Sequence, residues 1–247
     1  MGGHFEWTEK EIAELADGSR SVARMTLRFL RPLAGGQPAG DKALEAFAEH
    51  HLKLVPGTQE FKDAIARIKT EEIGERDATP EVGEVQEKHV YAVNVIRRSD
   101  KGPYVLEHQV KALLKQAASR IGLFKARIGT KGDMAEMGTV AAIGESLRNP
   151  ARPWEVYLRN GSGPATTSYD KIAGSVNTPR GKKSIQHHTE IAAEGSRISF
   201  EFRWPVGKLK AENLKEILAA AKIIGLGSCL SLGYGRFEVE SVVGEEK

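Results

Sequence analysis

The stretch from residue 198 to residue 242, ISFEFRWPVGKLKAENLKEILAAAKIIGLGSCLSLGYGRFEVESV, carries the clearest structural pattern in this chain of 247 residues. Apolar and polar residues alternate from Ile198 to Trp204, which predicts a half-buried strand. Apolar residues then recur at helical spacing over 210–224, and a second alternating strand covers 236–242. The C-terminal part of the chain is therefore predicted to form a strand, a helix, a glycine-rich loop and a strand.

Similar patterns upstream extend this unit. Alternation predicts strands over 24–30 and 184–191, and apolar residues three and four positions apart predict a helix over 107–122. The resulting order is β–α–β–β–α–β. This is the ferredoxin-like, split βαβ pattern related to the RRM domain, in which two helices cover one face of an antiparallel sheet. We therefore predict an α+β fold with a four-stranded antiparallel core.

The remaining residues are predicted to form two large insertions within a single domain that spans residues 1–247. We expect the core to comprise residues 20–31, 107–122 and 184–243, and the insertions to comprise residues 32–106 and 123–183. The first insertion contains predicted helices over 41–53 and 60–69 and a predicted strand over 89–96. In the second insertion, glycine and proline residues predict a long loop or an irregular hairpin over 160–183.

The composition excludes several classes of protein. The single cysteine, Cys229, excludes an internal disulfide framework and a zinc or iron–sulfur site built from cysteines. The mean hydropathy is −0.37, and no apolar run approaches the length of a membrane span. The first residues lack the apolar core of a signal peptide. We therefore expect a soluble protein that does not contact a membrane.

Charge is distributed unevenly along the chain, although the formal net charge is only +3. Residues 1–100 carry 14 basic and 18 acidic residues, whereas residues 101–200 carry 15 basic and eight acidic residues, a net charge of +7. This asymmetry favours an anionic partner on one face and a complementary neighbouring copy on another. Two ordinary solvated surfaces would explain it equally well.

The loop between the last helix and the last strand contains four glycines: Gly225, Gly227, Gly233 and Gly235. Glycines allow a positive φ and a close approach of another backbone segment, and their N–H groups can cradle an anion. This loop follows a helix and precedes a strand, the reverse of the order in dinucleotide-binding and P-loop motifs, so both of those are excluded. A tight connection for packing the helix on the sheet remains an equal alternative to anion binding.

This helix–loop–strand arrangement, with Gly-x-Gly-Arg-Phe close to the C-terminus, resembles the RAMP superfamily of CRISPR proteins. The residues after the first strand, from Phe29 to Ala39, also look like those of an uncharacterised group carried by phages and prophages. The resemblance implies a ferredoxin-like fold related to CRISPR backbone proteins, RNA binding, and the cytoplasm of a bacterial, archaeal or phage-infected cell. The apolar segment from Ser228 to Leu232 departs from the family, because it lacks the basic residue often found there.

We predict that the protein binds RNA or single-stranded DNA through basic side chains on the first strand, in the glycine-flanked loop before residue 184, and directly after the glycine-rich loop. These candidate contacts are Arg24, Arg28, Arg180, Lys182, Lys183 and Arg236. Tyr157 and Tyr169 are candidates for base stacking, whereas Trp154 is assigned to the core.

Neither catalysis nor a cofactor is predicted. His50 and His51 diverge on a helix, and His187 and His188 point to opposite faces of a strand, so neither pair can chelate a metal. An RNA endonuclease would need a general base such as His187 or His89, but no pattern selects either residue. Cys229 is more typical of a small packed side chain than of a nucleophile.

Three functions are therefore compared. The first is a nucleic-acid-binding RAMP-like protein that assembles as repeated copies along its ligand or within a multi-subunit complex. The second is a structural or assembly protein of a phage particle with the same fold, and the third is an RNA-processing enzyme. Head-to-tail association of an acidic segment over 60–87 with a basic segment over 123–183 would suit either of the first two.

Overall fold

A computed structural model describes residues 20–39, 41–50, 52–73, 91–123, 139–142, 155–178, 181–205 and 211–245. The described part is an α+β protein with four α-helices and three β-sheets, so the α+β part of the fold prediction is confirmed. The position of Trp154, which the sequence analysis assigned to the core, lies outside the described residues.

The first sheet contains the first strand and the last two strands of the predicted core. Its central strand β1 (Arg20–Phe29) pairs antiparallel with β13 (Arg197–Pro205) on one side and with β14 (Phe237–Glu245) on the other. The four-residue strand β7 (Thr139–Ala142) pairs antiparallel with the outer side of β13. The short strands β9 (Arg159–Asn160) and β10 (Gly163–Pro164) continue this sheet.

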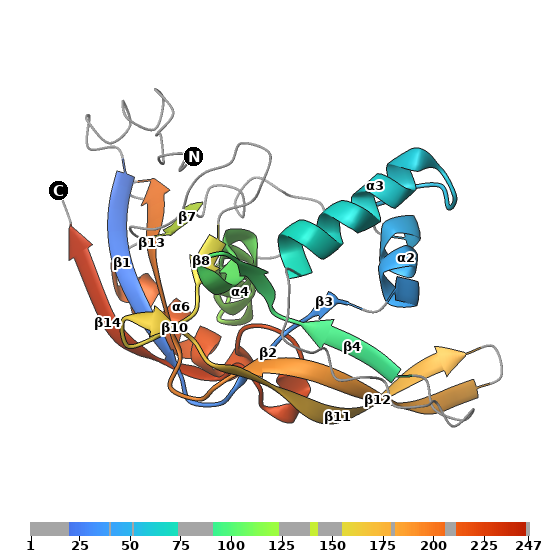
Figure 1. Cartoon of the computed structure of the whole chain (residues 1–247). Helices are drawn as coiled ribbons and strands as arrows, with labels where there is room; N and C mark the ends of the chain where they lie inside the picture. The colour runs from blue at the N-terminus through green and yellow to red at the C-terminus, as the bar shows by residue number, and fades with distance from the viewer. Residues whose placement is uncertain are drawn as a thin grey trace.

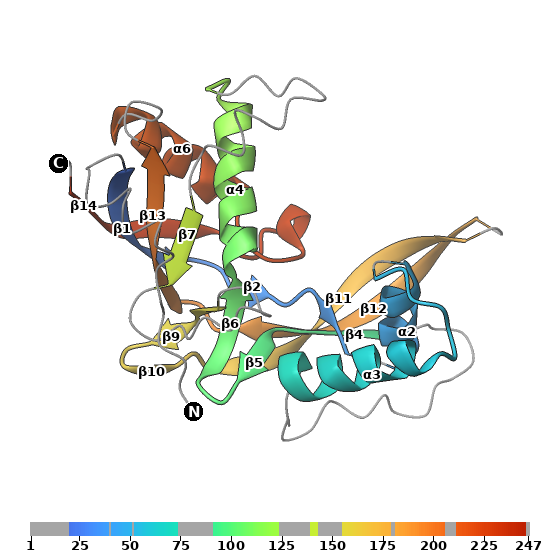
Figure 2. The same ribbon diagram turned by 90° about the horizontal axis from the view of Figure 1, so that it is seen from above.

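Two helices cover one face of this sheet, α4 (Glu107–Arg120) and α6 (Ala211–Ile224) (Figures 1 and 2). The alternating residues Met25, Leu27 and Phe29 of β1 are fully buried, because they face these helices. The apolar stripes of both helices join them in one large core, as the helical spacing predicted. The polar residues of β1 between them occupy the opposite, open face.

The placement of residues 184–191 in this core sheet was wrong. They lie in β12 (Gly181–Ala192), which forms a long regular hairpin with β11 (Thr167–Thr178) in a second sheet. Alternation identifies a strand but not its partner, and the glycines of residues 160–183 hid the regular register of β11. The place expected for this strand beside β13 is taken by β7.

The second sheet has the order β11–β12–β4–β3 and extends away from the first (Figure 2). The strand β4 (Tyr91–Val95) runs parallel to β12, while β3 (Gln37–Pro38) borders β4. The segment directly after β1 also joins this sheet, because β2 (Leu33–Ala34) pairs with the end of β12. The chain thus passes from one sheet to the other within a few residues of Phe29.

A helical pair lies against this second sheet. It consists of α2 (Asp41–His50) and α3 (Gln59–Arg67), and α3 continues into a π-helical turn, η1 (Ile68–Ile73). α3 begins at Gln59 because the Thr58 hydroxyl accepts a hydrogen bond of 3.2 Å from the amide of Phe61. A small core of Leu44, Ile68, Val93 and Val95 holds the pair on the sheet.

A third, small sheet joins the other two. It contains β5 (Arg97–Ser99), β6 (Gly102–Leu106) and β8 (Glu155–Tyr157). The Glu190 side chain of β12 is 2% exposed, and it accepts hydrogen bonds from the amide of Ile96 at 2.9 Å and from Arg98 at 3.0 Å. A buried carboxylate therefore ties the hairpin to the residues that begin the third sheet.

Candidate nucleic-acid interface

The glycine-rich loop adopts a backbone that other residues rarely take. Gly225, Gly227, Gly233 and Gly235 have φ values of +84°, +95°, +88° and +67°. A Cβ atom on Gly235 would lie 1.7 Å from the carbonyl oxygen of Leu226, and one on Gly227 would lie 2.8 Å from that of Ala34. The positive φ that glycines allow is therefore present at all four positions, and Gly227 and Gly235 also lie against another backbone segment.

Most of the loop's described amide groups donate to main-chain carbonyls. The Gly235 amide donates to Pro32 at 2.8 Å, the Ser228 amide to Ala34 at 3.0 Å, and the Leu226 amide to Gly235 at 3.0 Å. The Ser228 hydroxyl also donates to the carbonyl of Gly35 at 2.6 Å. These bonds hold the loop on the segment after β1, so the packing interpretation of the glycines accounts for their geometry without an anion.

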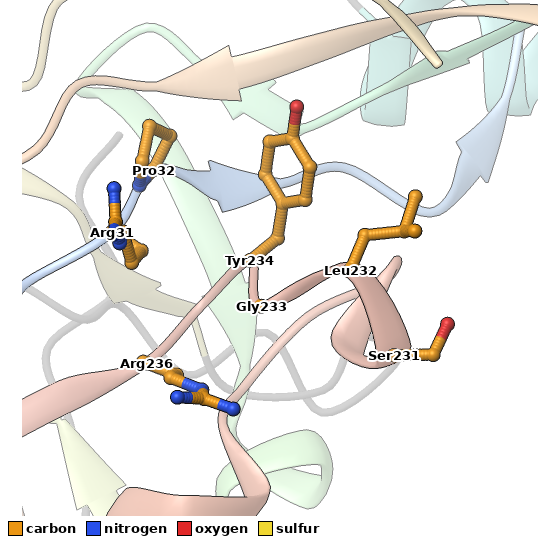
Figure 3. Close-up of a pocket in the computed structure, with 7 residues that line it drawn as sticks. All are labelled: Arg31, Pro32, Ser231, Leu232, Gly233, Tyr234 and Arg236. Carbon is orange, nitrogen blue, oxygen red and sulfur yellow. The ribbon is translucent and has the colours of Figure 1, made fainter. Parts of the chain in front are cut away.

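A pocket of about 550 Å³ opens where the loop meets the end of β1 (Figure 3). It is lined by Arg31 and Pro32 from one side and by residues 231–234 and Arg236 from the other. The two arginines are neighbours, because the Arg236 carbonyl accepts the amides of Leu30 at 2.8 Å and of Arg31 at 3.2 Å. Both side chains are exposed, and within the described part of the chain neither guanidinium has a carboxylate partner.

Tyr234 connects this pocket to the long hairpin. Its hydroxyl donates a short hydrogen bond to a carboxylate oxygen of Asp170 on β11. This hydrogen bond, together with partial burial, raises the pKa of Tyr234 to about 12, so the phenol stays protonated at neutral pH. One side chain of the loop is therefore fixed to the second sheet.

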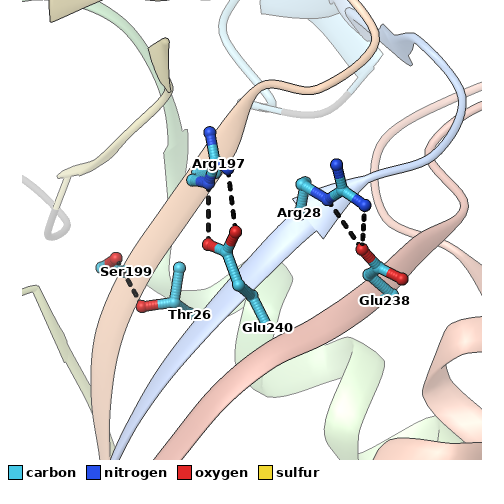
Figure 4. Close-up of polar contacts among 6 residues, drawn as sticks. All are labelled: Thr26, Arg28, Arg197, Ser199, Glu238 and Glu240. Carbon is cyan, nitrogen blue, oxygen red and sulfur yellow. Dashed lines mark hydrogen bonds and ion pairs between the residues drawn. The ribbon is translucent and has the colours of Figure 1, made fainter. Parts of the chain in front are cut away.

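The open face of the first sheet carries ion pairs rather than free basic groups. Arg24 bonds Glu201 at 3.1 Å, and Arg28 bonds Glu238 at 2.7 Å. Arg197 bonds both oxygens of Glu240 at 2.7 and 2.8 Å, as Figure 4 shows together with the Arg28 pair. The alternation of β1 predicted a basic surface here, but the carboxylates come from the neighbouring strands β13 and β14, whose register the sequence does not reveal.

Hydrogen bonds from arginines lower the pKa values of two glutamates on this face. Burial acts to raise the pKa of Glu201, but hydrogen bonds from Arg203 and Arg24 outweigh it, and the net pKa is lowered. The hydrogen bond from Arg197 likewise lowers the pKa of Glu240. Arg24 and Arg197 are therefore engaged with carboxylates whose pKa values are lowered, so that both remain charged at neutral pH.

The remaining predicted contacts are spread along the hairpin. Arg180 lies outside the described residues, whereas Lys182 and Lys183 lie at the distal end of β12, opposite Asn177 and Val176. At the rise of an extended strand, Lys182 is about 20 Å further along the hairpin than the register position of Asp170. The structure thus places Arg236 near the base of the hairpin and the two lysines near its tip.

Two other residues considered in the sequence analysis, Tyr157 and Cys229, are buried or half-buried in the fold. Tyr157 is 8% exposed, and the guanidinium carbon of Arg159 lies 5.2 Å from its ring centroid, so its face is not open to a base. Cys229 has a φ of +55° and is half-buried in the glycine-rich loop. Among the residues that the structure describes, no group of three histidine, cysteine or acidic side chains is arranged to hold a metal ion.

Sequence reasoning missed Arg31 and Tyr234. Arg31 directly follows the alternating strand over 24–30, and Tyr234 lies between two of the glycines. The predicted sheet already implied that the end of the first strand lies near the start of the last strand. That neighbourhood was the available signal for pairing Arg31 with Arg236.

No family model matches the chain, and no curated protein sequence matches it. Among solved structures, the chain is similar to one chain of a cryo-EM structure described as the type III-B Cmr-β bound to cognate target RNA. The TM-score is 0.43 and the sequence identity is 10%, over 98% of this chain and 69% of the other. No helix among the described residues is long and apolar enough to cross a membrane.

Proposed function

We propose that this protein is a RAMP-like protein that binds single-stranded nucleic acid, RNA in particular, at the pocket beside the glycine-rich loop. The observation that carries the proposal is the contrast between two sets of arginines. Arg31 and Arg236 are exposed at one pocket and have no carboxylate partner in the described structure. Arg24, Arg28 and Arg197 are each paired with a glutamate. Guanidinium groups that line one pocket and have no carboxylate partner suit phosphate binding.

The topology of the first sheet supports the proposal. Strands and helices follow one another as β1, α4, β7, β13, α6 and β14, and every neighbouring pair of strands in this unit is antiparallel. We infer a ferredoxin-like βαββαβ core from this order, as the resemblance to the RAMP superfamily implies. The single-domain organisation predicted for the whole chain is part of the same inference.

The open face of this core does not suit the stacking of bases that RRM domains perform. Its described side chains on β1 and β13 include Arg24, Thr26, Arg28, Ser199 and Glu201, none of which is aromatic. Base stacking on an RRM sheet depends on exposed aromatic residues. The proposed ligand therefore contacts the pocket and the hairpin rather than the face of the first sheet.

The hairpin extends the proposed contact surface. Lys182 and Lys183 belong to its distal end, and they contribute with Arg180 to the net charge of +7 over residues 101–200. A single strand that runs from the pocket along β11 and β12 would reach these cations. We expect contacts mainly to the backbone of the nucleic acid, and hence little sequence preference.

A salt titration tests the proposal. A fluorescent single-stranded RNA is titrated with the wild-type protein, with an Arg31→Ala/Arg236→Ala variant, and with an Arg24→Ala/Arg28→Ala control that changes the net charge equally. Each phosphate contact on a single strand contributes about 0.7 to the slope of log K against log salt. We expect the pocket variant to weaken binding and to reduce this slope by about 1.4, whereas the control changes both only slightly.

Two results would contradict the proposal. Equal losses in the two double variants would show that only net charge matters. The absence of binding by the wild-type protein at about 50 mM salt would exclude a nucleic-acid ligand and favour the structural protein of a phage particle.

A further inference from the structure

The side chain of Tyr234 is fixed at both ends. Its backbone lies between Gly233 and Gly235, whose φ values of +88° and +67° set the direction of the chain. Its hydroxyl is held by Asp170 of β11. In Figure 3 the ring stands in the pocket between Pro32 and Leu232. A ring anchored in this way loses little further freedom when a ligand packs against it.

The pocket combines this ring with groups of a different chemistry. Arg31 and Arg236 supply cations, while Pro32, Leu232 and Tyr234 supply apolar surface. Its volume of about 550 Å³ falls within the range of about 300–1,000 Å³ that is usual for sites of small organic ligands. A nucleotide has the matching parts, since a flat apolar base is joined through a sugar to anionic phosphates. A bare phosphate would leave the apolar wall uncovered.

We propose that Tyr234 is the stacking platform for one unpaired base, with the phosphates beside that base lying on Arg31 and Arg236. This inference rests on the proposed function and deepens it, because it assigns the pocket to a complete nucleotide of a single strand. A base within a duplex is already stacked on both faces, so it cannot cover the tyrosine ring. Tyr234 thus makes the site prefer single strands over duplexes.

Asp170 acts as a positioning residue in this arrangement. It accepts the hydrogen bond from the phenol and so holds the ring in place. Because the hydroxyl is already engaged, the contribution of Tyr234 to binding comes from its ring. A phenylalanine at this position keeps the ring but lacks the hydrogen bond to Asp170, so it should retain most, but not all, of the binding of a base.

The experiment separates the base from the backbone of the ligand. Two single strands of about 12 nucleotides are compared, an oligodeoxyadenylate and a strand of abasic residues with the same number of phosphates. Stacking on one aromatic side chain should make the wild-type protein bind the first about 5- to 150-fold more tightly. Tyr234→Leu should abolish this preference without changing affinity for the abasic strand or the salt slope, and Tyr234→Phe should preserve most of it.

The outcomes distinguish this inference from the proposed function. Equal affinity of the wild-type protein for both strands would overturn the stacking role while leaving phosphate binding intact, and this comparison needs no variant. A loss of affinity for both strands in Tyr234→Leu would also overturn it, since the residue would then be structural. The absence of binding to either strand would refute the proposed function itself. The Arg31→Ala/Arg236→Ala variant should weaken binding to both strands by the same factor.

Discussion

At the scale of single residues, the glycine-rich loop shows that glycines of one motif have different structural roles. Gly235 has a positive φ, and its Cα lies against the backbone of Leu226. Gly233 has a positive φ as well, but nothing lies within 4 Å of the position that its Cβ would occupy. Gly235 is therefore required both by its positive φ and by the lack of room for a Cβ atom, whereas Gly233 is required by its positive φ alone.

We therefore expect alanine at these two positions to destabilise the protein unequally. Gly233→Ala should lower the free energy of unfolding by about 1 kcal/mol, the strain of a left-handed alanine. Gly235→Ala should lower it by more than about 3 kcal/mol, because its Cβ would lie 1.7 Å from the Leu226 oxygen and the backbone must move. Denaturant unfolding gives both values.

Gly163 provides the matched control for this pair. Its φ is not positive, and the nearest atom to its hypothetical Cβ is 3.9 Å away. Gly163→Ala should change stability by less than about 0.5 kcal/mol. If Gly235→Ala were as stable as this control, the loop could not have the backbone described above.

Glu190 provides a second test at the residue scale. Its carboxylate is 2% exposed and accepts hydrogen bonds from Ile96 and Arg98. Glu190→Ala should lower the free energy of unfolding by about 2–3 kcal/mol, since it leaves a buried amide and a partly buried guanidinium without this acceptor. Glu194→Ala, at an exposed position in the following turn, serves as the control for urea unfolding.

At the scale of elements, the ion pairs on the open face of the first sheet make the stability of the protein depend on pH. The pKa of Glu240 is lowered in the folded protein by the hydrogen bond from Arg197, and the pKa of Glu201 is lowered overall by hydrogen bonds from arginines despite its burial. A carboxyl group whose pKa is lower in the folded state stabilises the fold above its unfolded pKa. That contribution is lost as the pH falls through the folded value.

We expect the melting temperature to fall as the pH is lowered from about 6 to about 3, and to fall less steeply in Arg197→Ala. Removing Arg197 returns the pKa of Glu240 towards its unfolded value, so that this group no longer contributes to the pH dependence. Arg120→Ala is the control, because Arg120 is exposed on α4 and has no carboxylate partner among the described residues. An identical pH dependence in Arg197→Ala and the wild-type protein would contradict the assignment of this ion pair.

At the scale of the whole molecule, the unequal distribution of charge along the sequence is the basis for the prediction that copies assemble along the proposed nucleic acid. Residues 1–100 have a net charge of −4 and residues 101–200 a net charge of +7, so neighbouring copies can present opposite charges to each other. We expect the mass of the complex to rise in steps of 27.0 kDa as the single strand is lengthened. Light scattering would measure these steps. One protein per strand at every length would contradict assembly as repeated copies.

The sequence by itself determined the parts of this protein that depend on local periodicity. The alternation of Met25, Leu27 and Phe29 and the helical spacing over 107–122 and 210–224 predicted the core strand β1 and the helices α4 and α6, because burial on one side enforces a period of two or 3.6 residues. The positive φ of Gly233 and Gly235 was also predictable, since glycine is the residue that adopts it without cost.

Only the tertiary structure decided which segments become neighbours. Alternation over 184–191 predicted a strand, but its pairing with β11 depends on contacts between separate segments, and a period of two carries no information about the partner. The same limit applies to the candidate site. The carboxylates that engage Arg24 and Arg28 belong to residues more than 170 positions further along the chain. Arg236, whose carbonyl accepts the Arg31 amide, is likewise distant from Arg31 in the sequence. Whether an arginine is paired or available to a ligand is a property of the folded chain, because a charge interacts with its neighbours in space and not with those in sequence.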